Sequence, residues 1–402
     1  MCAGRQAATP RPLPTMPTES ARYVHQALRT RLVFGPGVLA EAGREVAALG
    51  CRRPLVLASR RSRAMPAYAG LLASLAGAEV AESVDVPAHS SPQAVTAATQ
   101  ALSAHGADCL VAFGGGSVVD TAKGAALLAA EGGDLAAHAT RFEAPATLHA
   151  PPLLRAKLPI VAVPLTASGA EVTPSCGVRT AAGEKLLFWD PRLASRVVLL
   201  DPALNLAVPV SIMLETGMNA LAHCIEGLYS TQGSPIAATL ALEGARRLRQ
   251  ALPRVAADPR DAEARGALLE AAHMAGMVLA TARSCLHHAL CHVLGATCGA
   301  AHGALNAVML PHALRYNLPA AREPLAALAR AWDAGQAPQA AIDQVVALQA
   351  ALGVPRRLRE LGVARAVLPA VAARVLRERG LACNPRRVRG AAELEALLDA
   401  AW

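Results

Sequence analysis

Residues 109–123 read CLVAFGGGSVVDTAK and place a short apolar run directly before three glycines and a helix-forming segment. The run 109–113 is typical of a buried strand, and the pattern after the glycines predicts a helix to about residue 130. Glycines at such a junction let backbone N–H groups approach a phosphate, and the helix start adds its positive dipole end. The stretch therefore predicts a strand–turn–helix unit that binds a phosphate, although a tight turn without a ligand would give the same pattern.

Further β-rich runs alternate with helical stretches on both sides of this unit. One helix is expected to begin at the serine–proline stretch 90–92, because serine caps helices and proline fits the first turn. Strands that alternate with helices predict a mostly parallel sheet covered on both faces. The other predicted strands are Arg31–Phe34, Pro54–Ser59, Val80–Val86, Leu158–Val163 and Val197–Leu200.

The strand signal fades after about residue 204, where Ala, Leu, Arg and Glu recur at helical spacing, as in 237–252 and 262–282. The stretch 201–209, DPALNLAVP, contains two prolines and predicts a hinge. A ligand is expected in the cleft between the two halves. The expected organisation is a disordered tail over 1–20, an α/β domain over 21–204 and an all-helical domain over 205–402.

Composition limits the classes of function. Of 402 residues, 53% are hydrophobic and 17% charged, which excludes a mainly disordered protein. Nine cysteines without a CxxC pair are too few for a disulfide scaffold and predict a reduced, cytoplasmic protein. The net charge of +9 comes from three lysines and 36 scattered arginines, and aromatics make up 3%, so nucleic acid is not an expected partner. No apolar run is long enough to span a bilayer, so no membrane partner is expected either.

Two loops that follow predicted strands carry candidate cofactor ligands. In the glycine turn, Ser117 would hydrogen-bond a phosphate, and Asp120 is expected in the first helical turn. Thr166 and Ser168 belong to the stretch 164–173, PLTASGAEVT, at the strand end where open α/β sheets bind ligands. A small-residue loop without a ligand is the alternative interpretation of this second stretch.

Imidazoles recur at helical spacing in two segments of the second half. The set comprises Asn219 and His223 within 216–229, and His288, His292 and His302 within 285–311. Residues four apart share a helix face, so the members of each pair are expected to point the same way. The set predicts a metal site or an acid–base cluster, and separate core histidines are the alternative. The neighbouring His287 points off this face and is expected to be structural.

These motifs, in this order, resemble the iron-containing (group III) alcohol dehydrogenase superfamily and, within it, the maleylacetate reductases, over residues 21–402. The resemblance implies a dinucleotide-binding α/β domain, an all-helical catalytic domain, NADH or NADPH as cofactor, and a homodimer. It implies the following cofactor contacts: Gly115, Gly116 and Ser117 at the pyrophosphate, Thr166 and Ser168 at the nicotinamide-side phosphates, and Lys185 reaching the cofactor.

The resemblance also implies a position for a metal. Metal-dependent members bind iron or zinc through an aspartate and three histidines, which correspond here to Asn219, His223, His288 and His302, with His292 beside the nicotinamide. An amide brings only a dipole to a divalent ion. Maleylacetate reductases resemble this chain in having asparagine there and are regarded as metal-independent. We therefore expect that a divalent metal is not required, and that any bound ion would lie on the three histidines.

The activity implied is NAD(P)H-dependent reduction of maleylacetate, a small anionic molecule, to 3-oxoadipate. As a hypothesis, His223, His288 and His302 surround the developing oxyanion and His292 donates the proton. Arginine is the side chain best suited to bind the substrate carboxylates, and Arg283 and Arg315 are the candidates.

The end of the strand 54–59 bears on the choice of cofactor. Ser59 at this strand end is a further candidate cofactor contact. A carboxylate at this position would bind the ribose hydroxyls of NADH and repel the 2′-phosphate of NADPH, but here Ser59 is followed by Arg60 and Arg61. We therefore predict use of NADPH as well as NADH.

Two other functions stay open. The stretch 303–317 reads more like the alcohol dehydrogenases, which keeps a metal-dependent enzyme acting on a small alcohol or aldehyde as an alternative. A non-catalytic nucleotide-binding protein would bind NAD(P)H without turnover.

Overall fold

The computed structural model describes the chain except for residues 1–22, 24, 84 and 144–146, so the tail predicted over 1–20 lies outside the described residues. The first half forms a six-stranded sheet in the order β1-β10-β7-β4-β2-β3, and every pair of neighbours is parallel. Each predicted strand is present. The bounds are β1 Arg31–Phe34, β2 Pro54–Ala58, β3 Ala81–Ser83, β4 Cys109–Gly114, β7 Ile160–Pro164 and β10 Val197–Leu200.

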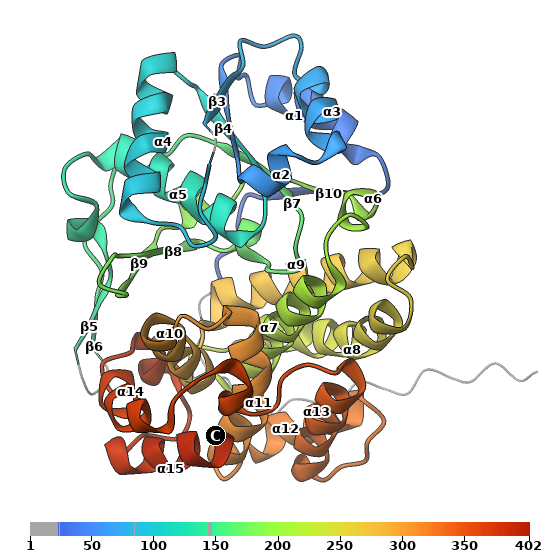
Figure 1. The fold of residues 1–402 in the computed structure, drawn as a ribbon, viewed down its shortest axis with the longest axis vertical. Helices are drawn as coiled ribbons and strands as arrows, with labels where there is room; N and C mark the ends of the chain where they lie inside the picture. The colour runs from blue at the N-terminus through green and yellow to red at the C-terminus, as the bar shows by residue number, and fades with distance from the viewer. Residues whose placement is uncertain (1–22, 24, 84, 144–146) are drawn as a thin grey trace, which may run out of the picture.

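Every residue of the central strands β2, β4 and β7 is buried, because helices cover both faces of the sheet. The predicted start of α4 is confirmed, since Ser91 accepts a hydrogen bond from Ala94 N at 3.1 Å and Pro92 lies in the first turn. The sheet and its helices occupy the upper part of Figure 1. The helices are α1 Ala42–Ala48, α2 Arg60–Arg63, α3 Pro66–Ser74, α4 Pro92–His105 and α5 Gly116–Glu131.

Two antiparallel hairpins in this half were not predicted. The first pairs β5 (Arg141–Glu143) with β6 (Thr147–His149), and the second pairs β8 (Ser175–Arg179) with β9 (Lys185–Trp189). Both extend toward the helical half in Figure 1. The second hairpin matters for function because it forms one wall of the cavity described below.

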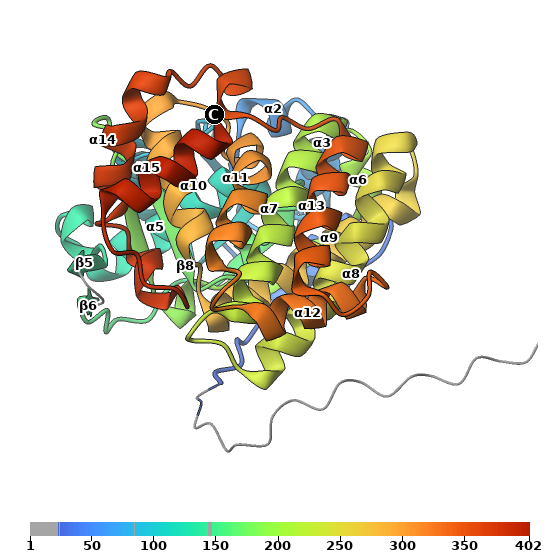
Figure 2. The ribbon, with the colours of Figure 1, turned by 90° about the horizontal axis from the view of Figure 1, so that it is seen from below.

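The second half is helical, as predicted, and Figure 2 shows α7 and α11 running through its middle. The predicted hinge contains a short helix, α6 (Pro202–Asn205), because Asp201 caps it by accepting from Ala203 N at 3.0 Å. Within the described ranges, no helix combines the length and apolarity that a bilayer crossing needs. The long helices are α7 Val210–Tyr229, α8 Pro235–Ala257, α9 Ala262–Ala282, α10 Leu286–Cys298, α11 His302–Asn317, α12 Arg322–Ala331, α13 Pro338–Leu352, α14 Leu368–Val375 and α15 Ala391–Ala401.

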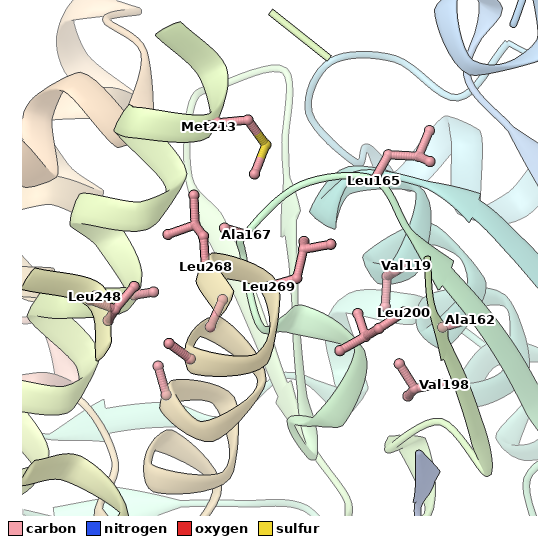
Figure 3. Packing of buried hydrophobic residues seen from close by; sticks show 14 of the residues in the cluster. Val119, Ala162, Leu165, Ala167, Val198, Leu200, Met213, Leu248, Leu268 and Leu269 are labelled. Atoms are coloured by element: carbon pink, nitrogen blue, oxygen red, sulfur yellow. The ribbon is translucent and has the colours of Figure 1, made fainter. Parts of the chain in front are cut away.

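One hydrophobic cluster joins the two halves. Figure 3 shows Val119 and Leu200 from the sheet half in the same packed region as Met213 and Leu268 from the helices. A second cluster lies within the helical half, among α10, α11, α14 and α15. The sheet contacts α9 through β10, and α9 packs against α7, which carries Asn219 and His223.

Candidate active site

The glycine turn lies where the strand order reverses. From β2 the chain passes to β3 on one side and then to β4 on the other, so the crevice between β2 and β4 is the switch point where such sheets bind ligands. Gly115 caps α5, and Gly116 is its first residue. The first N–H groups of this 16-residue helix have no acceptor within the helix, which makes its start a potential phosphate site.

The missing side chains let the turn pack against the loop after β7. A Cβ atom at Gly115 would lie 3.3 Å from Thr166 Oγ1, and one at Gly116 would lie 3.3 Å from Ser168 Oγ. The Thr166 hydroxyl is buried and has no hydrogen-bond partner in the described part of the chain. Ser117 donates from Oγ to the carbonyl of Ala88 at 2.5 Å, so its hydroxyl would have to turn to reach a phosphate.

The position predicted for Asp120 is wrong in one respect. Because α5 begins at Gly116, Asp120 falls in the second turn and not in the first. Its carboxylate accepts a hydrogen bond from Gly177 N at 3.2 Å, which ties α5 to the β8–β9 hairpin. Burial raises the pKa of Asp120, and the charges of Lys123 and Lys185 oppose that shift.

A cavity of about 330 Å³ brings the two halves together, with walls from α5, the loop after β7, the β8–β9 hairpin, α7, α10 and the start of α11. Most of the predicted site residues line it: Gly116, Ser117, Asp120, Thr166, Ser168, Lys185, Asn219, His223, His288, His292 and His302. Gly115 lies directly behind the lining as the cap of α5. Ser59 does not line the cavity, and its hydroxyl caps α2 by accepting from Ser62 N at 3.1 Å.

The imidazoles form one packed group. The rings of His223 and His288 are stacked, with centroids 3.9 Å apart and planes 10° from parallel. His292 and His302 form a second, looser pair, with centroids 5.7 Å apart. The ring of His288 lies 6.2 Å from that of His292, so the two pairs adjoin. Burial lowers the pKa of all four, which favours neutral rings in the free enzyme.

Glu226 orients His288 and was not predicted. Its Oε1 accepts from the backbone N–H of His287 at 2.8 Å, and its Oε2 lies 2.6 Å from His288 Nδ1. Glu226 is fully buried on α7. The spacing Asn219, His223, Glu226 repeats one helix face at intervals of four and three, so the sequence did contain a signal for this residue.

Neighbouring contacts fix the proton on His288. His287 Nε2 lies 3.0 Å from the carbonyl oxygen of Asn306 and must donate to it, so its Nδ1 carries a lone pair. That atom is 3.3 Å from His288 Nδ1, which therefore carries the hydrogen that Glu226 accepts. The Nε2 lone pair of a neutral His288 then faces Asn219, whose Oδ1 is placed 3.2 Å away. Two lone pairs cannot bond, so the amide oxygen and nitrogen must exchange places, which lets the N–H₂ group donate to the ring. His287 has the structural position predicted for it.

Cationic groups complete the cavity. Lys185 reaches it because Gly177 lacks a side chain, and a Cβ there would lie 2.4 Å from Lys185 Cε. Burial lowers the pKa of Lys185, while the charge of Asp120 raises it. Arg379, at the start of the turn Arg379–Cys383, also lines the cavity and was not predicted. Nothing in the sequence distinguishes Arg379 from the other scattered arginines.

The two predicted carboxylate-binding arginines have different outcomes. Arg283 lies near the site, with its guanidinium 4.1 Å from the centre of the Trp189 ring, and it lines a small pocket adjoining the main cavity at Arg379. Arg315 is exposed on α11 and does not line the cavity, so that interpretation is wrong. It faces solvent because the helix turns its opposite side to the core.

Lys123 supports the loop that carries Thr166 and Ser168. It is fully buried on α5, and its Nζ donates to the carbonyls of Ala170, Thr173 and Ser175 at 2.5–3.1 Å. One ammonium thus satisfies three loop carbonyls and fixes the loop relative to the glycine turn.

The three histidines that would ligate a metal do not fit one ion as they lie. An imidazole binds a metal in its ring plane at about 2.0–2.1 Å. Because the His223 and His288 rings are stacked 3.9 Å apart, an ion midway between them would lie about 2 Å out of each plane. Among the described His, Cys, Asp and Glu side chains, those that cluster at ligand distances here are Glu226, His287 and His288, which already bond one another.

Comparisons with known proteins show which family the chain belongs to. A model for iron-containing alcohol dehydrogenase matches residues 29–202, and one for the C-terminal part of the Fe-containing alcohol dehydrogenase family matches 213–402. The chain is 36% identical to the maleylacetate reductase of Burkholderia cepacia over 86% of this chain and 91% of that protein.

Two solved structures have the same fold. The maleylacetate reductase of Agrobacterium tumefaciens superposes with a TM-score of 0.80 at 32% identity, covering 95% of this chain and 98% of that one. The iron-containing alcohol dehydrogenase of Thermococcus thioreducens superposes with a TM-score of 0.86 at 29% identity, covering 93% and 98%. The chain belongs to the iron-containing alcohol dehydrogenase family and is an oxidoreductase.

Proposed function

We propose that this protein reduces maleylacetate to 3-oxoadipate with NADH or NADPH. One observation carries the proposal: the glycine turn at the sheet's switch point and the histidines of α7, α10 and α11 line a single cavity. Several maleylacetate reductases, 33–36% identical over most of the chain, support the substrate class. The cationic side chains of Lys185 and Arg379 in the same cavity suit a substrate with two carboxylates.

The cofactor would lie along the carboxyl ends of β2, β4 and β7. Backbone N–H groups at Gly116 and Ser117 would bind the pyrophosphate, and the unpartnered Thr166 hydroxyl, with Ser168, would bind on the nicotinamide side. When bound, the reduced nicotinamide supplies a hydride. Ser59 and the two arginines that follow it lie at the end of β2, where the adenosine ribose is expected, and Arg60 lies 3.5 Å from Asp85.

The protein's own groups would handle the charge and the proton. As the alkene carbon farther from the ketone receives the hydride, the C=C electron pair forms a double bond to the carbonyl carbon, and the C=O pair moves onto the oxygen to give an enolate. His223, whose buried Nδ1 has no partner in the described chain, and His302 would donate hydrogen bonds to that oxygen. His288 holds its N–H on Glu226, so it serves mainly to position the stacked His223. His292, 3.5 Å from Glu378, would donate a proton to the remaining carbon.

Purified protein assayed with maleylacetate and NADH or NADPH tests the proposal. We expect turnover with both cofactors, with and without chelator, and formation of 3-oxoadipate. A protein that reduces only neutral aldehydes, or that turns over only after iron or zinc is added, would contradict it.

A further inference from the structure

Arg379 lies at the boundary between two cavities. It lines the main cavity together with His292 and Lys185. It also lines a small pocket formed by Trp189, Arg283 and the loop that follows α9. The residue begins the short turn Arg379–Cys383, which follows the helix α14.

The Arg379 side chain has no assigned partner. Its Nη1 is buried and lacks a hydrogen-bond acceptor, and no ion pair joins Arg379 to any residue within the described ranges. An unpaired buried donor on a charged group costs free energy, so proteins usually pair it. A donor left open toward a cavity is therefore available to a ligand.

The surroundings select a negative ligand. Lys185 and Arg283 are close enough to disfavour the Arg379 charge. The carboxylate of Glu378 favours that charge, but it lies 3.5 Å from His292 and makes no ion pair with Arg379 in the described part of the chain. Burial lowers the pKa of Arg379 to about 10, so the guanidinium stays charged at neutral pH. A planar guanidinium binds a carboxylate through two parallel hydrogen bonds.

We propose that Arg379 binds one of the two carboxylates of the substrate and thereby sets the specificity for a dicarboxylic enone. This inference rests on the proposed function and adds the residue that distinguishes a dianion from a neutral substrate. Arg283, held on Trp189, would add its charge to the same end of the site without replacing the bidentate contact.

Steady-state kinetics of R379A, R379K and R377A test the assignment. Arg377 is exposed two residues earlier and does not line the cavity, so R377A is the matched control. For R379A we expect KM for maleylacetate to rise about 100-fold, which corresponds to about 2.8 kcal/mol. R379K should recover part of this loss, because an ammonium keeps the charge but not the two-pronged geometry. R377A should match the wild type.

Two monoacid analogues separate binding from a structural effect. (Z)-4-Oxopent-2-enoate lacks the acetate carboxylate, and the 1-methyl ester of maleylacetate lacks a charge on the alkene-side carboxylate. The R379A penalty should persist for one analogue and disappear for the other, while the Kd for NADH stays unchanged. Equal penalties on both analogues, or an unchanged KM for maleylacetate, would overturn the assignment. If the wild type itself does not reduce maleylacetate, the proposed function fails first and the assignment falls with it.

Discussion

The Glu226→Gln variant tests whether His288 is held in one tautomer. Two donors face the carboxylate, the His287 backbone N–H at 2.8 Å and His288 Nδ1 at 2.6 Å. Glutamine offers one oxygen and one N–H₂ group, so one of these donors must meet another donor. The backbone N–H cannot move its hydrogen, whereas His288 can shift its proton to Nε2.

The size of the effect follows from that mismatch. A buried donor left unsatisfied costs about 1–3 kcal/mol, which the protein avoids only by switching the His288 tautomer. The switch turns the Nε2 lone pair into a donor beside Asn219 and leaves the lone pairs of His287 Nδ1 and His288 Nδ1 facing each other at 3.3 Å. If that cost of about 1–3 kcal/mol is carried into the transition state, kcat/KM should fall by about 5–150-fold.

The assay compares E226Q with E270Q, since Glu270 lies near the surface on α9, 3.6 Å from Arg247. E270Q should retain wild-type kcat/KM and stability. E226Q should lose activity and also show a lower denaturant midpoint, with an unchanged Kd for NADH. If E226Q kept kcat/KM within about threefold of wild type, Glu226 would already be protonated in the native protein, and the reasoning about the tautomer would be refuted.

Three further expectations concern the metal, the interdomain contact and the loop clamp. Wild-type activity should survive dialysis against a chelator, and loss of activity on dialysis would contradict a metal-independent reaction. The N219D variant, which restores an anionic side chain, should retain more zinc or iron than wild type by elemental analysis. G276A should lower the free energy of unfolding by about 1–3 kcal/mol, because its Cβ would lie 2.4 Å from the carbonyl oxygen of Gly169. The control G70A, whose Cβ would have no atom nearer than 3.9 Å, should be neutral or slightly stabilising in the same denaturant titration. K123M should weaken NADH binding measured by fluorescence titration, because the loop carbonyls lose their shared donor; unchanged binding would mean that the loop holds its shape alone.

The sheet could be predicted from sequence because its strands are continuous apolar runs followed by turn residues. Cys109–Gly114 is buried along its whole length, and a run of that kind has few alternatives when a glycine turn and a helix follow. The β8–β9 hairpin was missed because its strands alternate with partly exposed residues, and part of its shape comes from α5, through the Asp120–Gly177 hydrogen bond. A hydrogen bond between residues 57 positions apart leaves no pattern in the local sequence from which the hairpin could be predicted.

The site residues likewise divide into those that the sequence predicts and those that it does not. Helical spacing placed Asn219 with His223 and His288 with His292, and the structure brings both pairs to one cavity. Spacing could not say that His223 would stack on His288, which depends on how α7 packs against α10. Arg379 was beyond prediction for a stronger reason, since its buried, unpartnered Nη1 depends on how the turn after α14 packs against α10 and the β5–β6 hairpin.

Charge balance links the asparagine at position 219 to the cationic side chains. In a site that holds a divalent ion, an aspartate there would offset part of the ion's charge. Here Lys185 and Arg379 supply the positive charge, and a substrate with two carboxylates would bring the compensating negative charge itself. An aspartate at 219 would add a further carboxylate 3.2 Å from His288 Nε2, and the same ring already has Glu226 on its other side. A neutral amide avoids that repulsion and still donates to the ring, so the substitution at 219 and the arginine at 379 suit the same dianionic ligand.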